Sequence, residues 1–289
     1  MREFKILTDN TADLPESYIR EHDLTLAWLP YLLDGETYTR ENTLDYPSFY
    51  AKMRAGSMPT TSQVNPQQAR EVLEGVLRQG YDVLYIAFSS GLSGTYNSVR
   101  MAAEELSEEY PEATLPVVDS LCASLGDGLL VHKAVQMKEA GKSLAEIREW
   151  LEANKLHLCH VFTVDDLNHL YRGGRVSRTA AFLGTLANIK PMLHVDDEGH
   201  LIALSKVRGR KKSISRLVDM MEERLGDWKD KNDIIFISHG DCIEDANRLK
   251  ELVEERTGIQ AYLIDYVGPT IGAHSGPGTL ALFFMGEKR

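Results

Sequence analysis

The sequence contains little cysteine and no long apolar run. Its three cysteines, Cys122, Cys159 and Cys242, lie far apart among 289 residues, so they offer neither a CxxC zinc motif nor the paired spacing of a disulfide framework. No apolar stretch approaches the roughly 20 residues that a bilayer span needs, and residues 1–5 lead directly into a strand-like segment. We therefore expect a cytoplasmic protein with no signal peptide and no stable membrane insertion.

Positive charge is also scarce. The chain has 32 Lys and Arg residues against 43 Asp and Glu residues, which gives a formal net charge of −11 at pH 7. Because this charge repels phosphate backbones and anionic membrane surfaces, general nucleic-acid binding is not expected. With 43% hydrophobic and 26% charged residues, the composition is that of a globular protein and excludes a disordered or collagen-like chain.

The first half of the chain alternates short apolar runs, polar loops and helix-period segments. Residues 5–8, 83–88 and 115–118 have the pattern of buried strands, and each is followed by a loop rich in hydroxyl and acidic side chains. This alternation is typical of a parallel sheet with crossover helices. Since ligands of such sheets lie beyond the carboxyl ends of the strands, we expect the functional site at these loops.

The second half has a different pattern. Residues 191–195 and 201–207 flank a turn sequence, which predicts a β-hairpin, and further strand-like and helical segments follow. We therefore predict an α/β protein with an N-terminal parallel-sheet α/β domain at residues 1–155 and a C-terminal α+β domain at residues 156–289. The charged helical segment 143–155 marks the predicted boundary, and the two domains are expected to pack around a shared cleft.

A run of hydroxyl side chains precedes a predicted helix. Thr60, Thr61 and Ser62 come shortly before Asn65 and Pro66, a pair typical of an N-cap residue followed by proline at the first helical position. Three adjacent hydroxyls are more than a cap requires, so they are candidate ligand-binding groups. A polar turn whose hydroxyls satisfy their own backbone is the alternative explanation.

A second polar turn contains Ser93, which lies between Gly91 and Gly94 and directly before the helical run 95–106. The free N–H groups and the dipole of a helix start favour a carboxylate or a phosphate there, although an ordinary glycine-containing turn is equally consistent with the pattern. The nucleophile-elbow motif G-x-S-x-G is broken because Thr95 occupies the position of its last glycine. No Gly-Lys-Ser/Thr sequence follows, so the turn is not a P-loop.

A third candidate segment, residues 268–278, combines His274 with four glycines and two prolines. We interpret it as a loop in which His274 donates a hydrogen bond to an anion or acts as a base, or has only a structural role. His157 and His160 are predicted to point to opposite faces of one strand, so we expect no metal site there.

Two segments concentrate positive charge in this acidic chain, residues 172–178 and 206–212. They could form a docking face for an acidic partner or a phosphate group. A solvated basic stretch is the alternative interpretation.

Taken together, these segments resemble the DegV family, whose fatty-acid-binding members include the FakB proteins of bacterial fatty-acid kinase systems. The resemblance spans the whole chain. It rests on ordered motifs at residues 8–14, 59–63, 89–96, 118–120, 173–177, 206–208 and 274–278. Val64 and Asn65 stand where many relatives carry Pro-Ser, a change that removes no proposed ligand.

The resemblance implies that a long-chain fatty acid lies in a tunnel between the two domains. Its carboxylate would be bonded by Thr61 and Ser93, with His274 close to it and with Ser62 and Gly94 in the same two turns. The family fold then implies a lipid-binding protein with no catalysis of its own, no metal and no cofactor. In the family, such a protein presents the acid to a separate ATP-dependent fatty-acid kinase, which makes an acyl phosphate used in phospholipid synthesis.

Two further interpretations follow from the resemblance and the site residues. Arg172, Arg175 and Arg208 become candidates for a surface that faces the kinase or a phosphate. The alternative function is a serine hydrolase that acts on acyl esters or acyl phosphates, with Ser93 as nucleophile, His274 as base and Asp119 as the group that orients the base.

Overall fold

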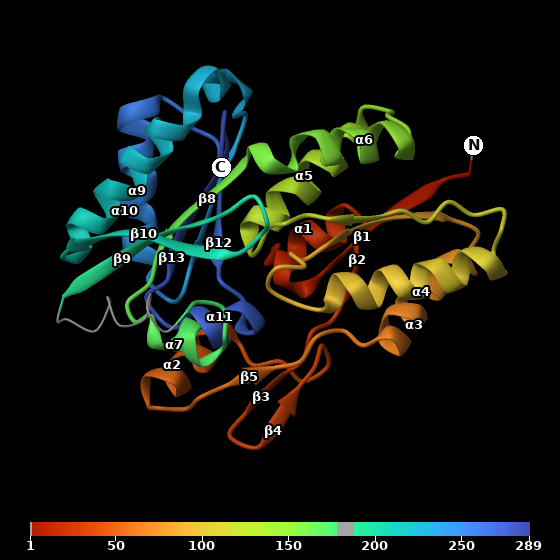
Figure 1. Cartoon of the computed structure of the whole chain (residues 1–289), viewed down its shortest axis with the longest axis horizontal. Helices are drawn as coiled ribbons and strands as arrows, with labels where there is room; N and C mark the ends of the chain where they lie inside the picture. The colour runs from red at the N-terminus through yellow and green to blue at the C-terminus, as the bar shows by residue number, and fades with distance from the viewer. Residues whose placement is uncertain (1, 178–187) are drawn as a thin grey trace.

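The first of two large sheets is parallel and is formed by the N-terminal half of the chain. In the computed structural model, which describes residues 2–177 and 188–289, the four strands are all parallel to their neighbours (Figure 1). The sheet order is β2 (Thr25–Ala27), β1 (Phe4–Asp9), β6 (Asp82–Ala87) and β7 (Val117–Asp119). The predicted N-terminal parallel sheet is therefore confirmed.

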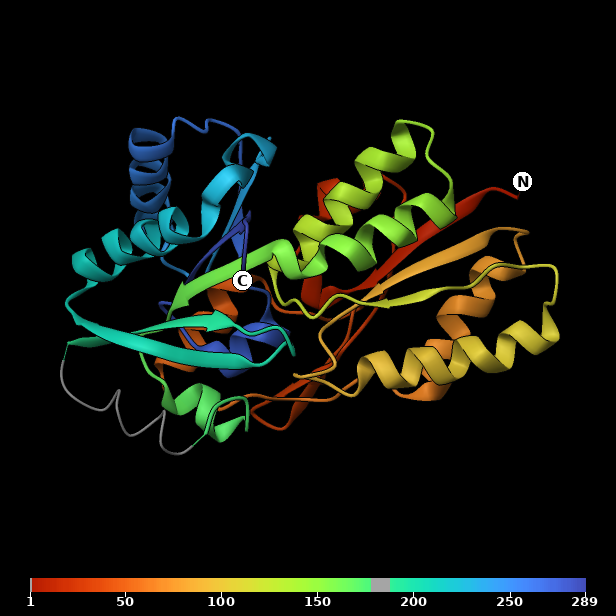
Figure 2. The same cartoon turned by 45° about the horizontal axis from the view of Figure 1, so that its top comes forward.

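Helices cover both faces of this sheet, as the alternation of its buried side chains requires. Leu7 and Tyr85 pack on one side with the first pair of helices, whereas Ile6 and Leu84 pack on the other side with the second pair. Figure 2 shows the sheet between the two helical layers. The first pair is α3 (Pro66–Leu77) and α4 (Thr95–Glu109), and the second is α5 (Leu125–Glu139) and α6 (Leu144–Asn154); the short α1 (Glu16–Glu21) lies beside the second pair.

The start of α3 follows from its local sequence. The Asn65 side chain accepts a hydrogen bond from the Gln68 N–H at 2.9 Å, and the Gln68 side chain accepts one from the Asn65 N–H at 3.0 Å. Pro66 occupies the first helical position, where its missing N–H is not needed. This reciprocal cap confirms the predicted N-terminus of the helix and fixes the position of the hydroxyl segment before it.

The second large sheet has six strands. Its order is β10 (Leu201–Arg208), β9 (Ile189–Val195), β8 (Leu158–Thr163), β13 (Leu280–Met285), β11 (Ile235–His239) and β12 (Tyr262–Tyr266). All neighbouring strands are antiparallel except the parallel pair β11 and β12. The predicted hairpin is β9–β10, and α9 (Arg210–Leu225) and α10 (Ile243–Thr257) pack on one face of the sheet. This mixed arrangement confirms the predicted C-terminal α+β unit.

Helix α5 joins the two sheets. Its buried residues, among them Leu125 and Leu129, belong to the same apolar cluster as Ile6 of the first sheet and Phe236 and Phe283 of the second. A helix that contacts apolar side chains on several sides cannot keep a single polar face, and α5 is accordingly buried along most of its length. The predicted boundary at residue 155 stays a prediction, since a continuous core crosses between the two sheets.

A third sheet and a short helix were not predicted from the sequence. The strands β3 (Tyr31–Leu33), β4 (Glu36–Tyr38) and β5 (Thr60–Thr61) form a small antiparallel sheet that packs beside α2 (Tyr46–Arg54). The expected loop at 268–278 contains a helix, α11 (Pro269–Ser275). The interpretation of this whole segment as a loop was wrong, because Pro269 is suited to the first helical position and Gly276, at φ +80°, ends the helix.

The remaining short elements are a single-turn helix η1 (Asn10–Ala12), the helix α7 (Asn168–Arg172), and the turns η2 (Lys155–His157) and η3 (Gly226–Lys231). Within the described ranges, no helix combines the length and the apolar character needed to cross a bilayer.

Two fully buried carboxyl groups lie where β1 ends and α5 begins. Asp9 accepts hydrogen bonds from Thr11 Oγ1 and from the Phe88 N–H, whereas Asp127 lies beside Ser120 and receives no hydrogen bond of normal geometry from the described residues. Burial raises the pKa of Asp9 to about 6. Burial, and then repulsion by Asp9, raises the pKa of Asp127 well above its ordinary value.

Asp127→Asn is therefore expected to stabilise the protein at high pH. A carboxyl whose pKa is raised by folding stabilises the native state fully below its unfolded pKa, near 4, and this contribution is lost as the pH rises through the folded pKa. In urea unfolding at pH 8, the variant should exceed the wild type by about 1 to 3 kcal/mol, and the difference should shrink towards pH 5. The exposed Asp227→Asn is the control, and a difference independent of pH would contradict this prediction.

Candidate functional site

A pocket of about 1030 Å³, part of it open to solvent, lies where the two large sheets and α11 meet. The segments that follow β2, β6 and β7 form one side, and inward-facing residues of β8 and β13 form the other. Most of its wall is apolar. The apolar lining residues include Leu29, Phe88, Leu92, Phe162, Leu170, Val195, Leu201, Ile271, Ala281 and Phe283.

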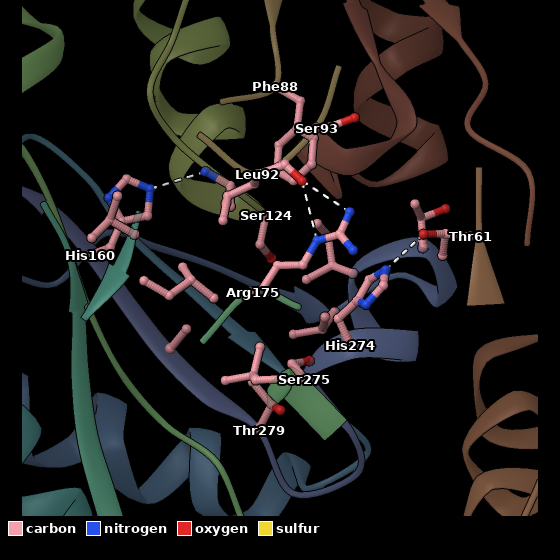
Figure 3. Close-up of a pocket in the computed structure, with 18 of the residues that line it drawn as sticks. Thr61, Phe88, Leu92, Ser93, Ser124, His160, Arg175, His274, Ser275 and Thr279 are labelled. Atoms are coloured by element: carbon pink, nitrogen blue, oxygen red, sulfur yellow. Dashed lines mark hydrogen bonds between the residues drawn. The ribbon is translucent and has the colours of Figure 1, made fainter. Parts of the chain in front are cut away.

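One end of the pocket is polar, and its central contact joins residues far apart in the chain. Thr61 Oγ1 on β5 lies 2.7 Å from His274 Nε2 on α11, within hydrogen-bond distance (Figure 3). Burial, and then the positive charges of Arg175 and Arg172, lower the pKa of His274 to about 4. His274 is therefore neutral at pH 7, with one ring nitrogen as donor and the other as acceptor.

The backbone of Gly173 fixes the position of the imidazole from the other side. A Cβ atom at Gly173 would lie 2.2 Å from His274 Nδ1, a distance that no side chain can adopt, so the ring packs directly against this glycine. Gly173 has φ −73°, and its role is this close approach rather than an unusual backbone conformation.

Ser93 lies in the turn before α4 and also faces the pocket. Its Oγ lies 2.9 Å from Thr95 Oγ1 and accepts a hydrogen bond from the Thr95 N–H at 3.2 Å. Thr95 Oγ1 in turn accepts from the Val64 N–H at 3.2 Å. These bonds connect the Ser93 turn to the segment that carries Thr61, so the two hydroxyl turns line the same pocket.

Gly94 and Ser62, the other two residues predicted for this site, line the pocket as well. A Cβ atom at Gly94 would lie 2.2 Å from Gln63 Oε1, so a side chain there would displace the Gln63 amide. The Ser62 N–H donates to the Pro30 carbonyl at 3.0 Å. The structure thus brings together all five residues of the predicted carboxylate site, Thr61, Ser62, Ser93, Gly94 and His274.

Arg175 lies in the pocket rather than on the outer, partner-facing surface that the sequence analysis suggested for it. Its side chain is half-buried and lines the pocket, where Nε and one terminal nitrogen donate to the Leu92 carbonyl at 3.2 and 3.0 Å. Its other terminal nitrogen donates to the Gly173 carbonyl. Burial lowers the pKa of Arg175, but a guanidinium stays charged at neutral pH, so the polar end of the pocket is positive.

The other two predicted arginines are exposed. Arg172 ends α7, where its side chain lies 3.0 Å from His169 Nδ1, and Arg208 ends the edge strand β10. Residue 178 of the first basic segment lies outside the described residues. The assignment of Arg172 and Arg208 to a partner or phosphate surface stays a prediction.

The hydrolase triad is not assembled. His274 Nε2 lies next to Thr61 rather than Ser93, and Ser93 bonds to Thr95. Asp119 Oδ1 accepts the N–H groups of Ser90 and Leu121 at 3.1 and 3.2 Å and so holds the turn after β7. The interpretation of Ser93, His274 and Asp119 as a triad was wrong, because each has a separate partner.

Several polar residues that line the pocket were not predicted as site residues from the sequence. Ser124 and Ser238 lie 3.0 Å apart through their hydroxyls, Ser275 Oγ is buried without a partner among the described residues, and His160 Nε2 accepts the Ala123 N–H at 3.2 Å. Ser275 directly follows His274 and could have been found from that motif. The others come from strands and turns whose facing side chains depend on how the two sheets pack.

Comparison with known protein families gave one match over nearly the whole chain. The family model described as an uncharacterised protein of the DegV family matches residues 3–287. A DegV domain-containing protein of Clostridium perfringens is 48% identical over 291 residues, which cover 100% of this chain and 99% of the relative. A DegV domain-containing protein of Streptococcus pyogenes is 41% identical, with 99% of each chain covered.

Solved structures with similar folds cover the same length. The structure described as fatty acid binding of a DegV family protein from Thermus thermophilus matches with a TM-score of 0.87 and 30% identity, covering 99% of this chain and 100% of the other. The structure of DegV from Bacillus subtilis, described as a fatty acid binding protein, matches with a TM-score of 0.84 and 31% identity over 99% and 100% of the two chains. The entire fold is therefore shared with these proteins.

The environment of His274 leads to a prediction for its titration. In the ligand-free protein, the ring should titrate with a pKa of about 4 and stay neutral at pH 6, as measured by NMR of the imidazole C–H groups. Arg175→Gln should raise this pKa but leave it below the ordinary 6.5, because burial is the larger cause. Arg208→Gln is the control and should leave it unchanged. A pKa near 6.5 in the wild type would show that the ring is solvated.

Proposed function

The chain belongs to the DegV family, and on this premise we propose that it binds a long-chain fatty acid, with the tail in the apolar pocket and the carboxylate at its polar end. The observation that carries the proposal is that one pocket combines a mostly apolar lining with a cluster of hydroxyl groups, a neutral imidazole and the Arg175 guanidinium. A fatty acid likewise combines an apolar tail with an acidic head group. The fatty acid is a ligand in this proposal, and the protein has no catalytic step.

The polar end supplies what a buried carboxylate needs. Burying a carboxylate without hydrogen bonds would cost several kcal/mol. Hydrogen bonds to a charged acceptor are about twice as strong as hydrogen bonds between neutral groups. Thr61 and Ser93 offer hydroxyl donors, and Arg175 offers the opposite charge. Neutral His274 would donate its Nε2–H to Thr61 Oγ1, which leaves the Thr61 hydroxyl free to donate to the ligand. We propose that Thr61 and Ser93 donate directly to the carboxylate.

The apolar wall supplies the affinity. Burying hydrocarbon contributes about 0.8 kcal/mol per CH₂ group, so a sixteen-carbon chain gives on the order of 10 kcal/mol before the entropic cost of binding. The head group contributes less, and its role is to set the direction in which the molecule enters. The proposed division of labour is therefore affinity from the tail and orientation from the head.

Removing a head-group hydroxyl should weaken binding. Thr61→Ala and Ser93→Ala should each cost about 1 to 3 kcal/mol, which corresponds to a dissociation constant about 5- to 150-fold higher, measured by displacement of a fluorescent fatty acid. The matched controls are the exposed neighbours Thr60→Ala and Ser90→Ala, which should leave the affinity unchanged.

The wild-type protein should also carry lipid from the cell. Mass spectrometry of organic extracts should find a fatty acid near one equivalent. Protein that is repeatedly free of lipid and that binds no fatty acid in the displacement assay would contradict the proposed function.

We further propose that the bound acid is presented to a separate ATP-dependent fatty-acid kinase, which forms an acyl phosphate for phospholipid synthesis. The position of Arg172 supports this proposal, because its charge acts on His274 while its side chain is exposed. A kinase that approaches the head group from this side would meet Arg172 first. Arg208, exposed at the end of the edge strand β10, extends the same positive character.

Charge reversal should separate presentation from binding. With a fatty-acid kinase, ATP and saturating fatty acid, Arg172→Glu and Arg208→Glu should slow acyl-phosphate formation about tenfold, as measured by hydroxylamine trapping. The dissociation constant for fatty acid should stay within about twofold in Arg208→Glu. Arg78→Glu, exposed at the end of α3, is the control. Unchanged rates for both variants would locate the kinase contact elsewhere.

A further inference from the structure

A second cavity lies on the other side of the segment that follows β1. It has a volume of about 1510 Å³, part of it open to solvent, and lies between η1, the start of α1, the start of α2 and the start of α11. Its wall contains five of the seven residues of the first motif, residues 8–14, namely Asp9, Asn10, Ala12, Asp13 and Leu14. The pocket described above, here called the acyl pocket, uses none of them. The motif therefore has a ligand-sized space of its own.

The charges around this cavity are mostly negative. Asp9, Asp13, Glu16, Asp45 and Asp265 line it, and none of these five carboxyl groups forms an ion pair within the described part of the chain. Burial raises the pKa of Asp265 and raises that of Asp13 well above its ordinary value, so a bound cation would favour the charged form of both groups. The pKa of Tyr46, also in the wall, is raised by burial and then by Asp13, Asp265 and Glu16. These three carboxylates therefore face one tyrosine hydroxyl from separate elements.

Asp13 provides an independent observation that points to a ligand. Only 7% of the residue is exposed. Its Oδ2 accepts a 2.6 Å hydrogen bond from Ser124 Oγ. Near Oδ1 lies the Gly268 N–H, which acts on the carboxyl group but does not reach Oδ1 in normal hydrogen-bond geometry, and no other described residue donates to it. A buried carboxylate oxygen in this state is costly unless a donor reaches it. Both Asp13 and Gly268 line the cavity, so a ligand can provide that donor.

The aromatic part of the wall is consistent with a cation. Trp28, Tyr31 and Tyr46 line the cavity. Aromatic faces attract cations and also cover their carbon skeleton. Arg40 lines the cavity too, at an exposed position, so the acidic side chains of the wall outnumber its basic ones.

The spacing of the carboxylates distinguishes between kinds of cation. In the described residues, three potential metal-ligand atoms come within 4.8 Å of one another only at Asp196, Glu198 and His200, on the β9–β10 hairpin. No three acidic side chains of the second cavity therefore come together as ligands of one metal ion within the described residues. Acidic side chains that come from separate elements of the wall can each accept from a different N–H group of an extended ligand. A quaternary ammonium group would leave Asp13 Oδ1 without a donor.

We propose that the second cavity binds a small organic cation that carries primary ammonium or guanidinium groups, with Asp13 and Asp265 as its charged ligands and Trp28 and Tyr46 as its aromatic walls. This site does not depend on the function of the acyl pocket. It assigns a ligand-binding role to the first motif of the sequence.

Trp28 allows binding to be observed directly. The chain has three tryptophans, so the double variant Trp150→Phe/Trp228→Phe leaves Trp28 as the sole tryptophan reporter in the cavity. Titration with spermidine, as the ammonium probe, and arginine, as the guanidinium probe, should give a saturable change in its fluorescence. Isothermal calorimetry on the unaltered protein repeats the measurement without any substitution.

Substitutions in the wall test the assignment. Asp265→Asn should raise the dissociation constant of the better probe at least tenfold, whereas the exposed Asp227→Asn should leave it within twofold. Asp13→Asn should abolish binding, provided that the variant folds. Glu16→Gln removes another negative charge of the wall at an exposed position, where folding is not at risk, and should raise the dissociation constant about threefold. Fatty-acid displacement should be unchanged in Asp265→Asn, which separates this site from the acyl pocket.

Several outcomes would overturn the proposal. The first two are saturation by Mg²⁺ but by neither organic probe, and binding of tetramethylammonium as tightly as spermidine or arginine. The other two are probe binding that Asp265→Asn and Glu16→Gln leave unchanged, and no binding of either probe in calorimetry. Binding of both probes with loss in the wall variants would support it.

Discussion

The contact between Thr61 and His274 connects two segments that are 213 residues apart, and the polar end of the acyl pocket exists only where they meet. Thr61 depends on the two-residue strand β5, and His274 depends on the seven-residue helix α11. Neither element is stable alone, because short strands and short helices gain their stability from packing. The head-group site therefore requires the whole fold around it.

The packing of α11 on α2 shows how His274 is held. Tyr50 Oη donates to the Val267 carbonyl at 2.7 Å, just before α11 begins. A Cβ atom at Gly272 would lie 2.6 Å from the same Tyr50 oxygen and 3.1 Å from Phe49, so glycine allows the two helices to touch. The position of the imidazole is thus set by an aromatic pair that precedes it by more than 200 residues.

The sequence predicted what depends on local chemistry. The strands of both large sheets except the three-residue β2, together with the Asn65 cap and the turn of Ser93, have signals within a few residues: an apolar run, a capping pair, or glycines next to a helix start. The small sheet of β3, β4 and β5 lacks such a signal, since its strands have only two or three residues. The inward position of Arg175 was not predictable either, because a basic segment looks the same whether its arginines point to solvent or to the Leu92 carbonyl.

The wall between the two cavities combines two costly features that stabilise each other. Ser124 has φ +53°, a conformation that non-glycine residues seldom adopt, and Asp13 is a buried carboxyl. The hydrogen bond from Ser124 Oγ to Asp13 joins them, and Ser238 lies 3.0 Å from the same hydroxyl. Thr270 lines both cavities and receives a hydrogen bond from Asn10 Nδ2 at 3.0 Å.

A single layer of polar side chains thus separates an acyl pocket with a positive end from a cavity with negative walls. Arg175 already donates from all three guanidinium nitrogens to the Leu92 and Gly173 carbonyls, so its position is fixed before any ligand arrives. In the proposed function, a carboxylate in the acyl pocket would meet this fixed positive charge, and its direct hydrogen bonds would come from the hydroxyls. An amine in the same pocket would meet repulsion from that charge, and the negative walls beyond the polar layer would repel a carboxylate in turn. The two proposed sites would therefore select their ligands by charge as well as by shape.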